Sequence, residues 1–422
     1  MPAATYRLSY PECLATLLQR LAEPAPAKIQ LLSGPRQVGK TTLLLELAER
    51  LGEGHSIYFA MDGPEAAFPG AWERLWVQAE SVARTRGRVV LFLDEIHALP
   101  NWAARLKGEW DRLKRKRIAV HVVATGSAAL HLGIGSKESL AGRFERLVLG
   151  HWTAAALVKV FNLSGQEAAE QMVRQGSYPG AMAYRKDLPR WLAYVRESIL
   201  EPAIGRDLIA LSAVRKPGLL RQVFGVCVHS PAQIVSLQKI QGQLQERGAL
   251  ETIAHYLHLL EDSYLVAALS KYSTTGARQR AAPPKLVTLS NALLAVSDPL
   301  GIPEAARNPA RFGAWVENAC LAHAWMSAQQ LQYWREEPYD VDAVMEGSWG
   351  RWALEIKTGP LRADELKGLA EFTGRHRRYQ PLVICDPPSI PTVQRAGMQA
   401  VGWPAFLLYG LPQALEQGGG LA

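Results

Sequence analysis

The first 150 residues alternate strand-like apolar runs with longer segments of helical composition. Residues 89–93, Val-Val-Leu-Phe-Leu, contain no polar side chain, which is typical of a strand buried on both faces of a parallel sheet. Segments 42–50 and 71–86 separate the runs and favour helices. This alternation predicts an α/β domain built around a parallel sheet. The strand-like runs are 29–32, 55–61, 89–93, 118–124 and 147–149.

The alternation stops after residue 150. Residues 151–215 contain no strong strand signal and are predicted to be helical, with an interruption at Tyr178-Pro179-Gly180. Residues 216–290 combine helical segments with short strands, a pattern similar to a winged helix. The helical segments are 237–244 and 250–261, and the strands lie near 264–266 and 285–289.

The second of these helical segments argues against direct reading of DNA bases. It contains no Lys or Arg, and its outward residues include Glu251, His255 and His258. Proteins that read the major groove normally bring basic or amide side chains to bases and phosphates. We therefore expect the winged-helix-like module to hold the shape of the protein or to bind a protein partner.

Composition places the chain among ordinary globular proteins. Its 422 residues are 48% hydrophobic and 20% charged, which is compatible with two to four domains. No apolar run approaches the roughly 20 residues that cross a bilayer, and the N-terminus lacks the apolar stretch of a signal peptide. The four cysteines are scattered without the spacing of a zinc site or a disulfide framework, so we expect a cytoplasmic protein without membrane contacts. They are Cys13, Cys227, Cys320 and Cys385.

The charge balance adds one expectation about partners. The net charge is +8 and the isoelectric point about 9.3, which favours polyanionic partners such as DNA. Three short clusters contribute to it, and each alone is interpreted as a solvated face rather than a binding site. The clusters are Arg84/Arg86/Arg88, Lys114 to Arg117, and Arg375/Arg377/Arg378.

The strongest chemical signal lies between the first strand-like run and the first helical segment. The pattern G-x-x-x-x-G-K-[ST] there predicts a loop whose backbone N–H groups surround nucleotide phosphates at a helix N-terminus. Its lysine would reach the β- and γ-phosphates and its threonine would ligate Mg²⁺. The alternative is a glycine-rich turn that only leads into a helix. The loop residues are Gly34, Pro35, Arg36, Gln37, Val38, Gly39, Lys40, Thr41 and Thr42.

An acidic pair supplies the second half of an ATPase site. Asp94 and Glu95 directly follow the apolar run 89–93, at the carboxyl end of a strand, where ligands of open α/β sheets bind. We predict that Asp94 holds Mg²⁺ through water and that Glu95 is the general base for the attacking water.

Further candidates follow the next strand. Thr125 or Ser127 would orient the water or sense the γ-phosphate, unless they only cap a helix. Arg143 precedes the last strand-like run, and it would serve either as an arginine finger in a neighbouring copy or as a structural ion-pair partner.

The C-terminal part carries a second constellation of charges. Residues 339–345 alternate polar and apolar positions, and after a turn residues 351–357 form a return strand. Glu355 and Lys357 then share one face, because side chains alternate along a strand. Asp342 from the neighbouring strand, with Asp340 as a substitute or addition, and Glu317 from a helical segment would join them. These carboxylates would hold Mg²⁺ while Lys357 activates water against a phosphodiester; the alternative is an exposed hairpin with incidental charges.

The motifs together resemble one family of bacterial and archaeal AAA+-type P-loop ATPases. The resemblance runs from about residue 28 to 385 and is carried by GPRQVGKTTLL, FLDEIHALPNW, ATGSAAL, SLAGRFERL and SYPGA. It implies an ATPase core, a helical lid, a winged helix and a restriction-endonuclease-like domain of the PD-(D/E)xK type. The corresponding ranges are an N-terminal helical segment 1–27, the core 28–150, the lid 151–215, the winged helix 216–290 and the nuclease-like domain 291–422.

The function that follows is a Mg²⁺-dependent ATPase that acts on DNA, with a C-terminal domain that binds or cleaves it. ATP and Mg²⁺ are the expected cofactors, and a homo-oligomeric ring is the assembly that would give Arg143 its role. Two alternatives stay open. One is a regulatory switch driven by nucleotide, whose C-terminal domain only docks partners; the other is a metal-dependent DNA nuclease gated by ATP.

Overall fold

The computed structural model describes residues 7–126, 140–209, 214–246, 248–273 and 282–420. These residues divide into two compact units, which are described separately. The first contains residues 1–150 and 205–213, and the second contains residues 151–204 and 214–422. In the part of the chain described, no helix is long and apolar enough to cross a membrane.

The first unit is built on a six-stranded sheet in which every neighbouring pair is parallel. The strands lie in the order β1-β6-β2-β5-β4-β3. The predicted α/β core with a parallel sheet is therefore present. The strands are β1 (Arg7–Leu8), β2 (Ile29–Ser33), β3 (Ser56–Ala60), β4 (Val89–Asp94), β5 (Val120–Thr125) and β6 (Phe144–Leu149).

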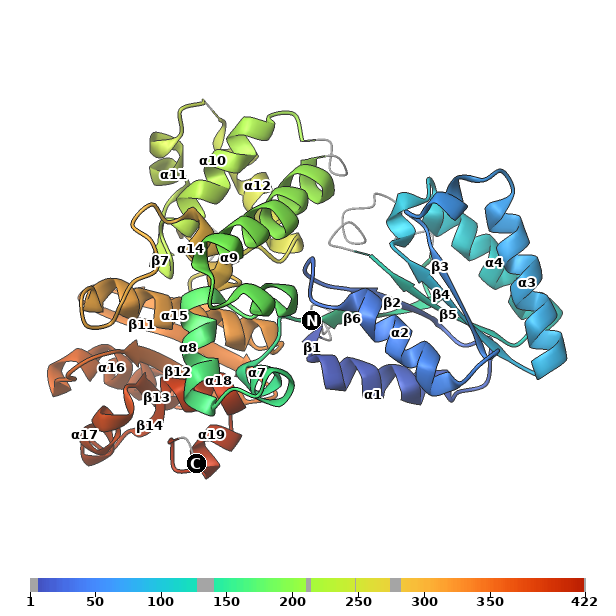
Figure 1. The fold of residues 1–422 in the computed structure, drawn as a ribbon. Coiled ribbons are helices and arrows are strands. Elements are labelled where there is room, and N and C mark those ends of the chain that lie inside the picture. The colour runs from blue at the N-terminus through green and yellow to red at the C-terminus, as the bar shows by residue number, and fades with distance from the viewer. Residues whose placement is uncertain (1–6, 127–139, 210–213, 247, 274–281, 421–422) are drawn as a thin grey trace. The chain divides into compact units, whose positions relative to one another are not determined.

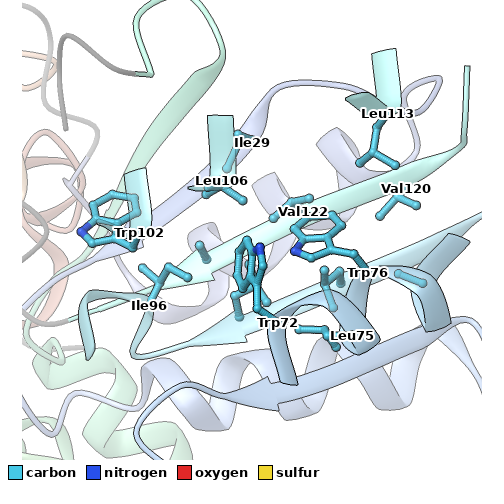
Figure 2. Close-up of a cluster of buried hydrophobic side chains, with 14 of the residues drawn as sticks. Ile29, Trp72, Leu75, Trp76, Ile96, Trp102, Leu106, Leu113, Val120 and Val122 are labelled. Atoms are coloured by element: carbon cyan, nitrogen blue, oxygen red, sulfur yellow. The ribbon is translucent and has the colours of Figure 1, made fainter. Parts of the chain in front are cut away.

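Helices cover both faces of this sheet, which explains why its central strands are continuously apolar (Figure 1). Side chains alternate along a strand: Val89, Leu91 and Leu93 of β4 pack against one pair of helices, while Val90 and Phe92 pack against the other pair. Figure 2 shows the first of these clusters, with the rings of Trp72 and Trp76 beside β5. The helices are α3 (Ala71–Arg86) and α4 (Trp102–Lys116) on one face, and α1 (Tyr10–Leu21) and α2 (Lys40–Leu51) on the other.

The second unit begins with helices that pack on the C-terminal end of the chain. Leu157 and Ala168 share a buried cluster with Leu408. The helical character predicted for residues 151–215 is observed in the elements up to residue 209, residues 210–213 lie outside the described residues, and the role of this range as a lid over nucleotide stays a prediction. The elements are α7 (Ala154–Phe161), α8 (Gly165–Gln175), a 3₁₀ helix (Pro179–Tyr184), α9 (Leu188–Tyr194) and two π-helical segments (Val195–Leu200 and Ala203–Ile209), of which the second crosses into the first unit.

The described residues from 217 to 288 form three helices and a small antiparallel sheet. The sheet order is β7-β9-β8, and these residues form, in chain order, a helix, a strand, two helices and two strands. The strand predicted near 264–266 begins only at residue 266, because residue 264 lies in a turn with a positive φ of 58°. The elements are α10 (Pro217–Val228), β7 (Gln233–Ile234), α11 (Leu237–Gln243), α12 (Leu250–Asp262), β8 (Val266–Leu269) and β9 (Lys285–Thr288).

A five-stranded mixed sheet forms the C-terminal core. Its order is β10-β11-β12-β13-β14, antiparallel between β10, β11 and β12 and parallel from β12 onward. The strands are β10 (Gln330–Glu336), β11 (Tyr339–Gly347), β12 (Gly350–Lys357), β13 (Gln380–Cys385) and β14 (Gln399–Gly402). The helices are α14 (Asn291–Ser297), α15 (Pro309–Met326), α16 (Lys367–Arg375), α17 (Ile390–Arg395), α18 (Trp403–Tyr409) and α19 (Gln413–Glu416).

A buried histidine makes this core sensitive to acid. His323 of α15 lies between the rings of Trp349 and Phe406, at centroid distances of 5.6 and 5.7 Å. Its Nε2 has no hydrogen-bond partner among the described residues. Burial lowers the pKa of His323 to about 4, so the ring is neutral in the folded protein at neutral pH.

Replacement of His323 by Phe is expected to remove part of the acid sensitivity of the second unit. An unfolded His titrates near pH 6.5, so native His323 binds its proton later than the unfolded chain does. The contribution of neutral His323 to the free energy of unfolding is therefore fully present above pH 6.5 and is lost as the pH falls toward 4. Urea unfolding at pH 7 and 4.5 should show about 1–3 kcal/mol less destabilisation by acid in the variant. If acid lowered the free energy of unfolding equally in His323→Phe, in the exposed control His255→Gln and in the parent protein, His323 would not be a source of the acid sensitivity.

Candidate functional site

The phosphate-binding loop leaves the carboxyl end of β2 and enters α2. Gly34 has φ of +152° and Gly39 has φ of +97°. A Cβ atom on Gly34 would clash with the carbonyl oxygen of Leu149, so the loop can pass β6 only with a glycine there. Val38 is fully buried and anchors the loop in the core between β2 and α2. The two glycines and the apolar anchor together fix the curvature that the sequence motif predicts.

The lysine of the loop is a buried cation without a carboxylate partner in the described residues. The Lys40 side chain is 6% exposed, and its Nζ donates to the carbonyl oxygens of Pro35 at 2.8 Å and Gly34 at 3.3 Å. Burial lowers the pKa of Lys40, and the more distant Glu95 carboxylate opposes that shift. A buried ammonium that has no carboxylate in hydrogen-bond contact favours an anionic ligand. The N-terminus of α2, which begins at Lys40, adds the positive end of its helix dipole.

A second loop residue is held by an ion pair. Nη1 of Arg36 lies 2.9 Å from Oδ1 of Asp207, which is 4% exposed. Asp207 belongs to the segment 205–213 that returns to the first unit. The phosphate loop is thereby tied to a part of the chain that lies 171 residues away in sequence.

Asp94 is the centre of the hydrogen-bond network at this edge of the sheet. Its Oδ2 accepts from Thr41 Oγ1 at 2.7 Å and from Tyr58 OH at 2.8 Å. Its Oδ1 accepts from Thr125 Oγ1. The side chain is 3% exposed, so the three donors offset the cost of burying a carboxylate. The contact between Thr41 and Asp94 brings together the two predicted Mg²⁺ ligands, and hard oxygen donors of this kind suit that ion.

Glu95, the next residue, has a backbone conformation that non-glycine residues seldom adopt. Its φ is +50°, and its N–H donates to Thr125 Oγ1 at 3.2 Å. Oε2 of Glu95 lies 3.2 Å from Nδ1 of His97. Left-handed backbone at a non-glycine residue is concentrated in functional sites. Here the left-handed backbone turns the Glu95 side chain away from that of Asp94. The Asp94 carboxylate therefore lies in the hydrogen-bond network, and the Glu95 carboxylate lies outside it.

Two of the predicted residues are not part of this cluster. Arg143 precedes β6, whose Phe144 pairs with Ile29 at the start of β2, so it lies at the amino edge of the sheet, opposite the phosphate loop. There its guanidinium binds both oxygens of Asp111, with Nε–Oδ1 at 2.8 Å. This excludes a direct role in the site of its own chain, while action on a neighbouring copy stays a prediction. Ser127 lies outside the described residues.

Two residues of the site were missed by sequence reasoning. Tyr58 lies in β3 and Asp207 in a helical segment of the lid range, and neither belongs to a recognisable short motif. Tyr58 lies in the predicted strand 55–61, but its alignment with β4, where it pairs with Phe92, two residues before Asp94, is seen only in the structure. Asp207 offered no sequence signal, because its partner is distant in sequence.

The four predicted residues of the C-terminal constellation are brought together in the second unit. Glu317 comes from α15, Asp342 from β11, and Glu355 and Lys357 from β12. Nζ of Lys357 lies 2.9 Å from Oε1 of Glu355, and Oδ2 of Asp342 accepts from the N–H of Ile356 at 2.9 Å.

A fifth charged residue, Lys285 of β9, stands at the centre of this constellation. Its Nζ lies 2.6 Å from Oε1 of Glu317 and 3.1 Å from Oδ1 of Asp342. Sequence reasoning placed Lys285 only in a wing strand. No group of three or more His, Cys, Asp or Glu side chains in the described part of the chain is arranged to hold a metal ion.

The electrostatics of the constellation are those of a tightly packed charge cluster. Burial and then the Asp342 carboxylate raise the pKa of both Glu317 and Glu355 to about 8. Burial also acts to raise the pKa of Asp342, but the ammonium groups of Lys285 and Lys357 outweigh it and hold that pKa below its usual value. Burial acts to lower the pKa of Lys285, and the carboxylates of Asp342 and Glu317 outweigh it. Asp342 is therefore an anion and Lys285 a cation.

Comparison with family models finds matches over two ranges of the chain. Residues 26–157 match the model of the AAA domain, and residues 166–303 match a domain of unknown function, DUF8612. The first range contains the phosphate loop, Asp94, Glu95 and Thr125 in the geometry described above. The chain thus carries an AAA domain. Neither match reaches the five-stranded sheet, which begins at β10.

The similar proteins add no assigned activity. Uncharacterized proteins of Mycobacterium bovis (Mb2031c) and Mycobacterium tuberculosis (Rv2008c) are each 27% identical over 356 residues, covering 81% of this chain and 73% of the relative. Among solved structures, Aeropyrum pernix ORC1 in complex with DNA aligns with TM-score 0.33 and 17% identity, over 70% of this chain and 93% of that one. DnaA of Aquifex aeolicus bound to AMPPCP aligns with TM-score 0.31 and 16% identity, over 62% and 92%. Such TM-scores are too low to support an argument from the alignments.

Replacement of Thr125 by Val is expected to lower kcat of ATP hydrolysis about 10- to 100-fold, the usual effect of losing a partner that orients a metal ligand. The change keeps the shape of the side chain, but it removes the donor to Asp94 and the acceptor for the Glu95 N–H. The KM for ATP should change much less, because Thr125 has no contact with the phosphate loop residues in the network described. Thr125→Ser should restore most of the rate, since it keeps the hydroxyl.

Steady-state kinetics of the two variants check this role, with the exposed Thr85→Val as the matched control. A Thr125→Val protein with unchanged kcat would show that the hydroxyl does not position the acids.

Proposed function

We propose that this protein is a Mg²⁺-dependent ATP hydrolase whose turnover acts on DNA. The observation that carries the first half is the buried ammonium of Lys40, which has no carboxylate partner among the described residues, beside the Thr41–Asp94 contact and Glu95. A cation, a hydroxyl, a metal-binding carboxylate and a separate carboxylate are the groups that phosphoryl transfer to water requires.

Each residue has one task in this proposal. Lys40 and the loop N–H groups bind the phosphates of ATP, and the charge on Lys40 stabilises the negative charge that collects on the transferred group. Glu95 accepts the proton of the attacking water. Thr41 and Asp94 would hold Mg²⁺, which supplies charge neutralisation between the β- and γ-phosphates. Tyr58 and Thr125 keep Asp94 oriented through its two oxygens.

A basic surface on the first unit supports DNA as the partner. Val89 of β4 and Val120 of β5 are register partners, so the amino ends of these strands are adjacent. The helices that lead into them, α3 and α4, both end in basic residues. Two clusters that each looked like an ordinary solvated face in the sequence therefore form one surface. It comprises Arg84, Arg86, Arg88, Lys114, Arg115, Lys116 and Arg117, all exposed.

The charges of this basic surface are largely uncompensated. Within the described part of the chain, its one ion pair joins Lys116 to Glu80 at 3.9 Å. The third basic cluster of the sequence differs, because Arg375 binds Glu336 and Glu371 and Arg378 binds Glu346. Phosphates would have to displace carboxylates at the third cluster, but not at the basic surface. The surface on α3 and α4 is therefore the one that fits a DNA backbone.

The elements from α10 to β9 support a protein-binding role within this proposal. Among the described residues, their order of helix, strand, two helices and two strands resembles that of a winged helix, which supports this interpretation. The helix in the recognition position, α12, exposes Glu251, His255 and His258. A surface without Lys or Arg suits a protein partner better than a phosphate backbone.

Glu95→Gln is expected to lower the rate of ATP hydrolysis by at least about 100-fold, the lower range for loss of a general base. ATP binding should be retained, because Glu95 is not among the groups that hold the phosphates. The measurement is phosphate release with and without DNA, together with equilibrium binding of ATP. Glu53→Gln, an exposed carboxylate after α2, is the matched control. Full activity in Glu95→Gln would remove Glu95 from the mechanism.

Replacing Arg115, Lys116 and Arg117 together by Ala is expected to weaken DNA binding at least about 10-fold near 0.1 M salt. The salt dependence, as the slope of log K against log salt, should become shallower by about 0.9 for each phosphate that the variant no longer neutralises. The triple control Arg174/Lys186/Lys239→Ala removes the same charge from exposed positions of the second unit. Fluorescence anisotropy on duplex and single-stranded DNA measures both quantities. Equal affinities of the two triple variants would show that binding follows net charge rather than this surface. An ATPase rate that no form of DNA changes would contradict action on DNA.

A further inference from the structure

Lys285 is a lysine in an environment that lysines normally avoid. It begins β9, its residue is 4% exposed, and its neighbours Leu286 and Val287 are fully buried. A buried ammonium is tolerated only when charges and hydrogen bonds compensate the loss of water. The partners of Lys285 are therefore the reason for its position.

Those partners satisfy the ammonium completely. Its three N–H groups face three oxygens: Oε1 of Glu317 at 2.6 Å, Oδ1 of Asp342 at 3.1 Å and the backbone carbonyl of Asp342 at 3.0 Å. An ammonium has three donors and no acceptor. Nothing in this arrangement is left for water or for substrate.

The same oxygens are the ones that a divalent cation would need. Mg²⁺ binds through one or two carboxylates at about 2.0–2.1 Å. The Lys285 nitrogen lies between the carboxylates of α15 and β11, where such an ion would make these bonds. Both cations cannot share the position, because the ammonium already stands at hydrogen-bond distance from each oxygen. Lys357, the other cation, forms its ion pair with Glu355 at 2.9 Å.

Buried amide groups fix Lys285 in this position. Asn318, next to Glu317, accepts from the N–H of Thr288 at 2.9 Å and donates to its carbonyl at 2.7 Å. Asn318 also donates to Asn291 at 2.8 Å. These bonds fasten β9, the strand that carries Lys285, to the helix that carries Glu317. The ammonium is held by the backbone as well as by its own ion pairs.

We propose that Lys285 is a built-in cation that fills the divalent-metal position between Glu317 and Asp342. As folded, the C-terminal domain then binds no Mg²⁺ or Mn²⁺ at this cluster and cleaves no phosphodiester there. Loss of the ammonium opens a divalent-cation position between the carboxylates of Glu317 and Asp342. The inference concerns the second unit alone and does not depend on ATP hydrolysis in the first.

A simple structural salt bridge predicts a different outcome. If the cluster only needed an ion pair, removal of Lys285 would leave buried carboxylates that destabilise the fold whether or not metal is present. If the position is that of a metal, a divalent ion should replace the lost ammonium and restore stability. The dependence of stability on metal therefore separates the two accounts.

The test compares Mn²⁺ binding by nucleotide-free, full-length proteins. Free Mn²⁺ is measured by electron paramagnetic resonance for the parent protein, Lys285→Ala, and Lys285→Ala/Asp342→Asn. Any Mn²⁺ held elsewhere is common to all three. We expect one additional Mn²⁺ in Lys285→Ala and its loss in the double variant. The melting temperature of Lys285→Ala should rise by several degrees with millimolar Mn²⁺, whereas that of the parent protein and of the exposed control Lys239→Ala should not.

Two results would overturn the proposal. One is a folded Lys285→Ala protein, shown by circular dichroism, that gains neither Mn²⁺ nor thermal stability from it. The other needs no change at Lys285: the parent protein and Asp342→Asn should bind the same number of Mn²⁺ ions. One ion fewer in Asp342→Asn would show that the cluster holds metal with Lys285 present. This second comparison tests whether the cluster binds metal as folded even where Lys285→Ala fails to fold. ATPase rates measured on the same proteins keep a failure here separate from a failure of the ATPase proposal.

Discussion

The hydrogen bonds to the Asp94 carboxylate are the constraint on which the geometry of the ATPase site depends. They connect the end of β4 with the first turn of α2 through Thr41, with β3 through Tyr58 and with β5 through Thr125. A carboxylate buried to 3% exposure must have such donors. Once they are in place, the loop, the Thr41–Asp94 contact and the position of Glu95 are fixed together. The network is the reason that three neighbouring strands and one helix act as a single site.

The buried lysines in the two charge clusters have opposite electrostatic surroundings. In the first unit a buried lysine has no carboxylate in contact among the residues described, which favours an incoming polyanion such as a triphosphate. In the second unit a buried lysine is surrounded by carboxylates, which leaves no unmet charge for a ligand. The two clusters therefore have a similar composition. They differ in whether the chain itself places a carboxylate in contact with the buried lysine. This contrast favours the first unit as the place of the chemistry.

How much of this could be predicted from sequence depended on the distance between interacting residues. The phosphate loop is a contiguous motif, and the acidic pair follows an apolar strand, so both could be predicted from short stretches of the sequence. The pairing of Glu355 with Lys357 followed from the alternation of side chains along one strand. Asp207, Tyr58 and Lys285 escaped, since each meets its partners only after distant segments have packed. Lys285 is an example: the four residues predicted for a nuclease-like site do come together, yet β9, from a distant segment, supplies the cation between Glu317 and Asp342.

Equilibrium binding of ATP in the presence of Mg²⁺, compared between the parent protein and Lys40→Ala, tests the central claim most directly. Charge-assisted hydrogen bonds contribute about 1.5–3 kcal/mol each, so the account predicts that Lys40→Ala binds ATP about 10- to 100-fold more weakly. The exposed control Lys159→Ala should bind as the parent protein does. Equal affinities of Lys40→Ala and the parent protein would show that the buried ammonium does not bind phosphate, and the proposed ATPase site would be wrong.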